Sequence, residues 1–73
     1  MINYYEKGEV LVELDYNGVK VNGILDKYTG IGGDIRIVNK NGEVLFTNNK
    51  FDSSKIKSLI FKDLKGEIIR SPY

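Results

Sequence analysis

The chain has 73 residues and a net charge of +1, and it contains neither cysteine nor histidine. The lack of cysteine excludes a disulfide framework and a thiolate nucleophile, and the lack of histidine removes the usual proton carrier at neutral pH. Most standard catalytic sets are therefore excluded, and we expect neither an enzyme nor a cofactor. A chain this short is one small β domain, 1–73, and it buries only roughly 60% of its unfolded surface, so a homo-oligomer would supplement its thin core.

The first two thirds of the chain alternate apolar and polar residues at the two-residue period of a strand. Residues 9–15 predict a first strand and residues 19–25 a second. After a glycine-rich stretch at residues 28–33, the alternation returns around Ile35 and Ile37, and again around Val44 and Phe46. Residues 48–54 then predict a polar connection with one buried aromatic residue, Phe51.

A turn-like tetrapeptide that begins with Asp or Asn and ends in Gly occurs three times, at residues 15–18, 39–42 and 63–66. Each lies between apolar runs, as a type I turn closed by a left-handed glycine at a hairpin bulge requires. We therefore expect three hairpins, with Gly18, Gly42 and Gly66 at positive φ.

The last third of the chain has two interpretations. Ser53 could cap a helix over residues 53–65, which would leave a four- to five-stranded sheet with one helix packed on it. The third turn instead predicts strands at residues 58–62 and 67–70. We favour the hairpin, so the predicted fold class is all-β, a small antiparallel meander or barrel of five to six short strands. The predicted core consists of Val10, Val12, Leu14, Val19, Val21, Leu25, Ile35, Ile37, Val44, Phe46, Ile60 and Ile68.

Residues 10–28 resemble the first motif of the Sm-like and SH3-like small β-barrels. In that motif an alternating strand leads to a turn glycine, followed by a hydrophobic residue, a second glycine, a leucine and an aromatic residue at fixed spacings. Gly18, Val21, Gly23, Leu25 and Tyr28 meet those spacings. The resemblance implies a small barrel. It does not carry over a nucleotide pocket, because Thr29 and a glycine-rich stretch replace the family's RNA-binding residues after the aromatic.

Four tyrosines are predicted to contact a partner protein, because termini and turn tips are usually exposed and exposed tyrosine is a good interface anchor. They are Tyr4, Tyr5, Tyr16 and Tyr73. The expected function is a non-enzymatic protein-interaction module, an adaptor or inhibitor. A composition rich in Lys, Asn and Ile suggests an AT-rich bacterial or phage genome, so we expect a mobile-element protein that acts on a bacterial enzyme.

The alternative is nucleic-acid binding by a small barrel of Sm-like type, through C-terminal bases with help from Phe61 or Tyr73. The bases are Lys55, Lys57, Lys62, Lys65 and Arg70. A net charge of +1 disfavours this alternative, since counterion release supplies much of such affinity. If the bases scatter or pair with N-terminal acids, a protein partner is favoured. No secretory signal or membrane span is recognisable, so we expect a cytoplasmic protein without a membrane partner.

Overall fold

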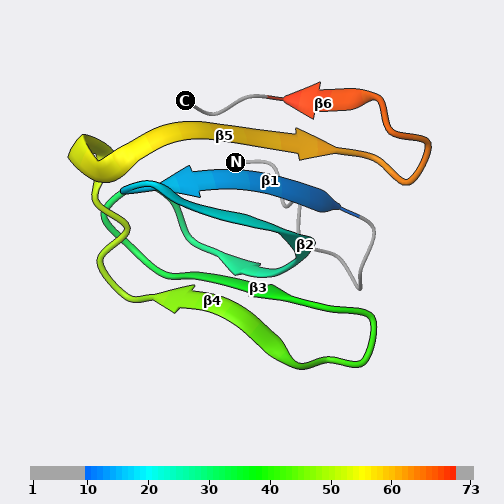
Figure 1. The fold of residues 1–73 in the computed structure, drawn as a ribbon, viewed down its shortest axis with the longest axis horizontal. Coiled ribbons are helices and arrows are strands. Elements are labelled where there is room, and N and C mark those ends of the chain that lie inside the picture. Colours follow the sequence, from blue (N-terminus) through cyan, green and yellow to red (C-terminus); the bar gives the residue numbers. More distant parts are fainter. Residues whose placement is uncertain (1–9, 71–73) are drawn as a thin grey trace.

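The computed structural model describes residues 10–70, apart from the side chain of Arg70. These residues form six antiparallel strands in one sheet, in the order β4-β3-β2-β1-β5-β6, and the sheet is not closed (Figure 1). The all-β class is therefore confirmed. In chain order the elements are β1 (Leu11–Tyr16), β2 (Val19–Tyr28), β3 (Ile35–Val38), β4 (Val44–Asn48), η1 (Ser53–Lys55), β5 (Ile56–Lys62) and β6 (Ile68–Arg70).

All three predicted chain reversals are confirmed. Gly18, Gly42 and Gly66 have φ of +89°, +82° and +87°. In the second and third turns one side-chain oxygen, from Asn39 or Asp63, accepts backbone N–H groups two and four residues later. These two turns are the same local structure built twice.

The first turn has a different shape from the predicted one. Tyr16 pairs with Val19, so only Asn17 and Gly18 form the loop. Both have positive φ, Asn17 at +55°, which is the signature of a two-residue type I′ turn. Asn tolerates the left-handed region better than most residues, so the chain reverses without the longer turn.

The helical alternative for residues 53–65 is wrong. Only the three residues of η1 are helical among those described, so no helix there could cross a membrane. Asp52 caps η1 by accepting the backbone N–H and the hydroxyl of Ser54. These hydrogen bonds, with the nearby charge of Lys55, hold the pKa of Asp52 below its usual value.

Four bulges curve the sheet around its core. At each, the register skips one residue, namely Asp26 in β2, Leu45 in β4, Lys57 in β5 and Ile69 in β6. An extra residue in one strand bends that strand and increases its twist. The sheet therefore wraps around one apolar face without closing.

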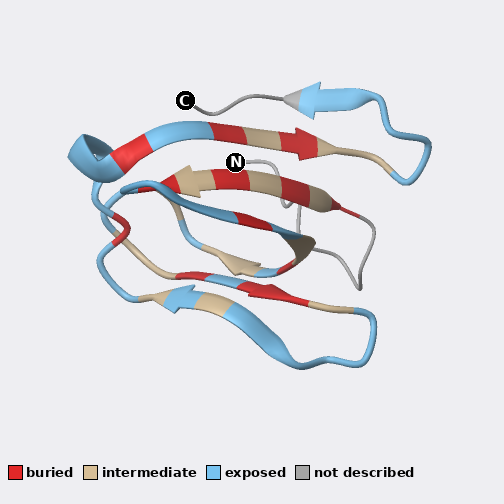
Figure 2. Ribbon diagram, in the orientation of Figure 1, coloured by how far each residue is buried: buried red, intermediate tan, exposed pale blue. Residues whose placement is uncertain are grey.

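The inner face of this curved sheet holds the core, and most of the predicted core is confirmed. Figure 2 shows the buried residues alternating along β1 and concentrated in β1, β2, β3 and β5. Phe46 is half-buried and packs against the core, whereas Phe51 is fully buried as expected. Buried and predicted alike are Val10, Val12, Leu14, Val21, Leu25, Ile35 and Ile37.

Four predicted core residues are wrong, three of them because of the sheet's pairing. The bulge at Leu45 turns Val44 onto the outer face, and the bulge at Ile69 does the same to Ile68. Ile60 pairs with Glu13 on the outer face, so its neighbours Leu59 and Phe61 enter the core instead. Val19 adjoins the first turn and is exposed at the end of the hairpin. Tyr16 is buried in the core against expectation, and Ile56, which was not in the predicted core, joins it. Val38 is buried too, but on the outer face, opposite Ile24.

Candidate functional site

An apolar row crosses the outer face of the sheet, the face turned away from the core. Residues directly opposite each other in an antiparallel pair point to the same face. The register places one such set side by side across all six strands. This apolar row consists of Val44, Val38, Ile24, Leu11, Lys62 and Ile68, and Lys62 is its single charged member.

A groove of about 510 Å³ lies over the middle of the apolar row. Half-buried Leu11 and Ile24 line its floor, and Asn39 and Lys40 of one turn and Gly66 of another also line it. Val44 and Ile68, the two ends of the row, are 54% and 61% exposed. The groove therefore presents an apolar floor with polar groups around it.

The charged groups of the groove are partly neutralised within the chain. Glu13, the one acid among its described lining residues, accepts a hydrogen bond of 2.6 Å from Lys62 Nζ. Lys40 is exposed and forms no ion pair within the described residues. Among the groove's lining residues within 10–70, Lys40 is thus the charge without an ion-pair partner.

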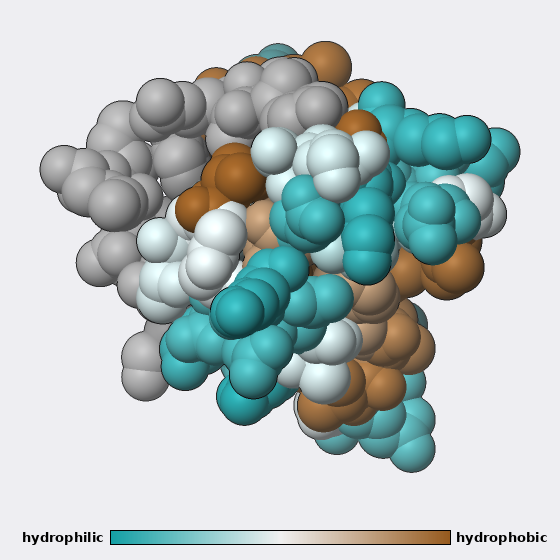
Figure 3. Space-filling view, turned by 90° about the vertical axis from the view of Figure 1, so that its left-hand side faces the viewer, coloured by the Kyte–Doolittle hydropathy of each residue, from teal (hydrophilic) through white to brown (hydrophobic). Residues whose placement is uncertain are grey.

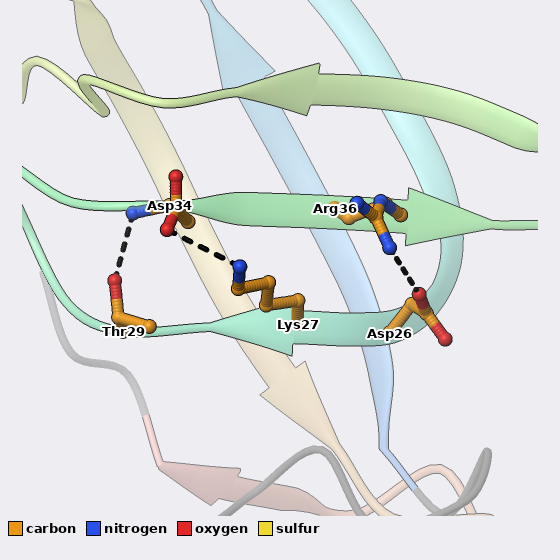
Figure 4. Close-up of polar contacts among 5 residues, drawn as sticks. All are labelled: Asp26, Lys27, Thr29, Asp34 and Arg36. Atoms are coloured by element: carbon orange, nitrogen blue, oxygen red, sulfur yellow. Dashed lines mark hydrogen bonds and ion pairs between the residues drawn. The ribbon is translucent and has the colours of Figure 1, made fainter.

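The outer face beside the groove is polar. Asp26 in β2 binds Arg36 in β3 at 3.2 Å, and Lys27 in β2 binds Asp34, just before β3, at 3.3 Å (Figure 4). Thr29 Oγ1 accepts the backbone N–H of Asp34. Both ion pairs are largely solvated, so each contributes at most about 1 kcal/mol. This part of the outer face is charged and solvated, as is usual for the exposed face of a sheet, and so differs from the apolar row.

Both edge strands of the sheet carry a bulge at an exposed apolar residue, Leu45 in β4 and Ile69 in β6. Bulges are one of the devices by which proteins block strand addition at a sheet edge. A partner strand would therefore find a broken ladder at either edge. The face of the sheet is the better contact surface.

The predicted exposure of Tyr16 is wrong. Tyr16 follows Val12 and Leu14 on the inner face of β1 and is only 8% exposed. Its ring stacks on Phe51 with centroids 5.3 Å apart, and its hydroxyl accepts the backbone N–H of Asp52. Tyr4, Tyr5 and Tyr73 lie outside the described residues.

The predicted nucleic-acid bases do not gather at one place. Lys55 and Lys57 lie in η1 and near the start of β5. Lys62 ends β5 and Lys65 lies in the turn that follows, at the opposite end of that strand (Figure 1). Lys62 is paired with an N-terminal acid, Glu13. Of the two predicted stacking residues, Phe61 is fully buried and Tyr73 lies outside the described residues. The side chain of Arg70 is not described. This arrangement favours a protein partner.

Figure 3 shows the end of the molecule that holds η1 and the first turn. Hydrophilic surface occupies the middle of this end, and hydrophobic patches lie at the lower right and, smaller, at the upper left of it. A smaller depression of about 320 Å³ here is lined by Ile31, Lys50 and Ser53, among others. It lacks the unbroken apolar floor of the groove.

Runs of consecutive apolar residues in the sequence indicate the groove, although the alternation of apolar and polar residues does not. Val10, Leu11 and Val12 are consecutive apolar residues, as are Ile24 and Leu25. Because neighbours along a strand point to opposite faces, such runs place apolar side chains on both faces. Ile37 and Val38 repeat the pattern in β3.

In the described part of the chain no group of three or more acidic, histidine or cysteine side chains is placed to hold a metal ion. No protein-family model matches the chain, and no curated protein or solved structure shows significant similarity to it. The apolar row and its groove therefore stand as the candidate site on physical grounds.

Proposed function

We propose that the protein is a non-enzymatic protein-interaction module, an adaptor or inhibitor, that binds a partner protein over the groove. The observation that carries this proposal is the apolar row on the face that should be wet. In an open antiparallel sheet one face packs on the core and the other is ordinarily polar. A contiguous apolar surface rimmed by polar residues marks a contact site.

The energetics of the row support this assignment. Fully burying a Leu or Ile side chain contributes about 1.5–3 kcal/mol relative to leaving it exposed. Leu11 and Ile24 are half-buried in the free chain, so a partner would gain part of that amount from each. Val44 and Ile68 are more exposed and offer more area at the margins.

We propose further that the chain is a small barrel of the Sm-like and SH3-like type. Three placements support this. Gly18 closes the turn between β1 and β2, Gly23 lies within the long strand β2, and Tyr28 packs against the core. The composition rich in Lys, Asn and Ile supports a phage or mobile-element source and a bacterial enzyme as the partner.

Replacing Ile24 by threonine should abolish or strongly reduce partner binding without unfolding the protein. Threonine keeps the β-branched shape that suits a strand but replaces an apolar group of the groove floor with a hydroxyl. The measurement is affinity capture from the native host, with quantitative mass spectrometry of the proteins recovered by the wild type and the variant.

Lys20→Thr is the matched control, because Lys20 lies in the same strand and on the same face but outside the groove lining. We expect Lys20→Thr to recover the partner at the wild-type level. Equal recovery by Ile24→Thr and the wild type would show that the groove is not the contact surface.

A further inference from the structure

Lys40 is the feature of the groove that the apolar floor does not explain. Glu13 among the lining residues is neutralised by Lys62 at 2.6 Å. Glu43, beside Lys40 in the same turn, accepts a hydrogen bond of 2.8 Å from the Asn39 side-chain amide. Lys40 lines the groove and has no ion-pair partner within residues 10–70.

The surroundings of Lys40 define what would complement it. The floor beside it is formed by Leu11 and Ile24, and Asn22 adds an amide. An apolar side chain fits this floor, and a carboxylate near that side chain would meet the ammonium group. Charge complementarity of this kind selects among partners more than it adds raw affinity.

We propose that the groove takes an acidic, apolar segment of the partner protein, with one apolar side chain on the floor and a neighbouring carboxylate against Lys40. This inference rests on the proposed function and names the chemistry of the partner for the same site. The segment docks on the sheet face, because the bulges at Leu45 and Ile69 break the ladder at both edges.

The site also excludes a basic segment. A lysine or arginine placed over the floor would face Lys40 with the same charge. Glu13, the one carboxylate among the described lining residues, is already bound by Lys62. Like charges brought together at an interface disfavour the wrong partner.

A displayed library of random octapeptides, selected on the immobilised full-length chain, tests the proposal. Peptides selected by the wild type should pair Asp or Glu with Leu, Ile, Val or Phe and should be depleted of Lys and Arg. Lys40→Glu should weaken the selected peptides roughly ten-fold, because the reversal replaces an attraction with a repulsion.

Lys20→Glu is the matched control. It changes the net charge by the same amount on the same face, outside the groove lining. It should leave affinity within about two-fold, because an exposed charge that does not contact the bound segment is largely screened by salt. Equal weakening by both reversals would mean that only overall charge matters, and it would overturn the assignment of Lys40. Selection of basic peptides would overturn it as well.

The result with Ile24→Thr separates this inference from the proposed function. If selected peptides lose binding to Ile24→Thr but not to Lys40→Glu, the groove is the contact surface and the acidic segment is wrong. If no peptide is enriched, the acidic segment is wrong, and affinity capture with Ile24→Thr still tests the proposed function. If binding is indifferent to Ile24→Thr, both proposals fail. Circular dichroism melts of each variant confirm that the compared proteins are folded.

Discussion

Phe51→Ala lowers the free energy of unfolding by about 3–5 kcal/mol, as expected for a fully buried phenylalanine. Phe51 lies in the connection between β4 and β5, and its ring is 5.3 Å from that of Tyr16 and 6.2 Å from that of Tyr28. The Phe51 carbonyl accepts a hydrogen bond of 2.7 Å from the Gly32 N–H, and the Phe51 N–H donates one of 2.9 Å to the Gly33 carbonyl. These hydrogen bonds hold the connection in place, so it does not collapse into the cavity that alanine would leave. The total free energy of unfolding of a native protein is only about 5–15 kcal/mol, so this loss is a large part of it.

Urea unfolding followed by circular dichroism measures this loss. Phe46→Ala is the matched control, because it makes the same substitution at an aromatic residue that is only half-buried on an edge strand. Phe46→Ala should lower the free energy of unfolding clearly less than Phe51→Ala does. If the two variants lose equal stability, Phe51 contributes no more to the core than the half-buried Phe46, contrary to the difference in their burial.

Gly23→Ala is the second large effect, a destabilisation of about 1–3 kcal/mol from overpacking. A Cβ atom at this position would lie 2.7 Å from Ile37 Cγ2 and 2.7 Å from the backbone oxygen of Val38. The backbone oxygen belongs to β3 and moves only if its pairing with β2 changes. The glycine is therefore required for space, since its φ is not positive.

Thermal and urea unfolding of Gly23→Ala measures this effect. Asn22→Ala, next to it in β2 and exposed, should change stability by no more than about 0.5 kcal/mol. A Gly23→Ala protein as stable as the wild type would show that β2 and β3 approach each other less closely than the structure has them.

The hairpins were predictable because turn chemistry is local. Asn39 and Asp63 each satisfy two backbone donors within four residues, and the following Gly42 and Gly66 adopt positive φ. Nothing distant is needed for such a turn. The same locality explains why the third turn decided correctly between hairpin and helix.

The bulges were not predictable, and they caused the errors at the sheet edges. Val44 and Phe46 are two residues apart and were assigned to one face, but the extra residue Leu45 separates them. Ile69 has the same effect on Ile68. The position of a bulge is set by how two strands fit around a shared core. The alternation of apolar and polar residues along one strand carries no information about that fit.

The candidate site was half visible in the sequence. Consecutive apolar residues at Leu11 and Ile24 indicate two apolar faces, but only the pairing of β1 with both β2 and β5 brings Leu11 beside Ile24 and Lys62. The lysines show the converse. Lys57 and Lys62 are close in sequence, yet they lie at opposite ends of one strand.

A salt titration against short single-stranded DNA and RNA distinguishes a protein partner from nucleic acid. We expect weak or absent binding at about 150 mM salt, because the lysines of η1 and β5 are scattered and Lys62 is paired with Glu13. Sub-micromolar binding that weakens steeply as salt rises would overturn the proposed protein partner in favour of nucleic acid.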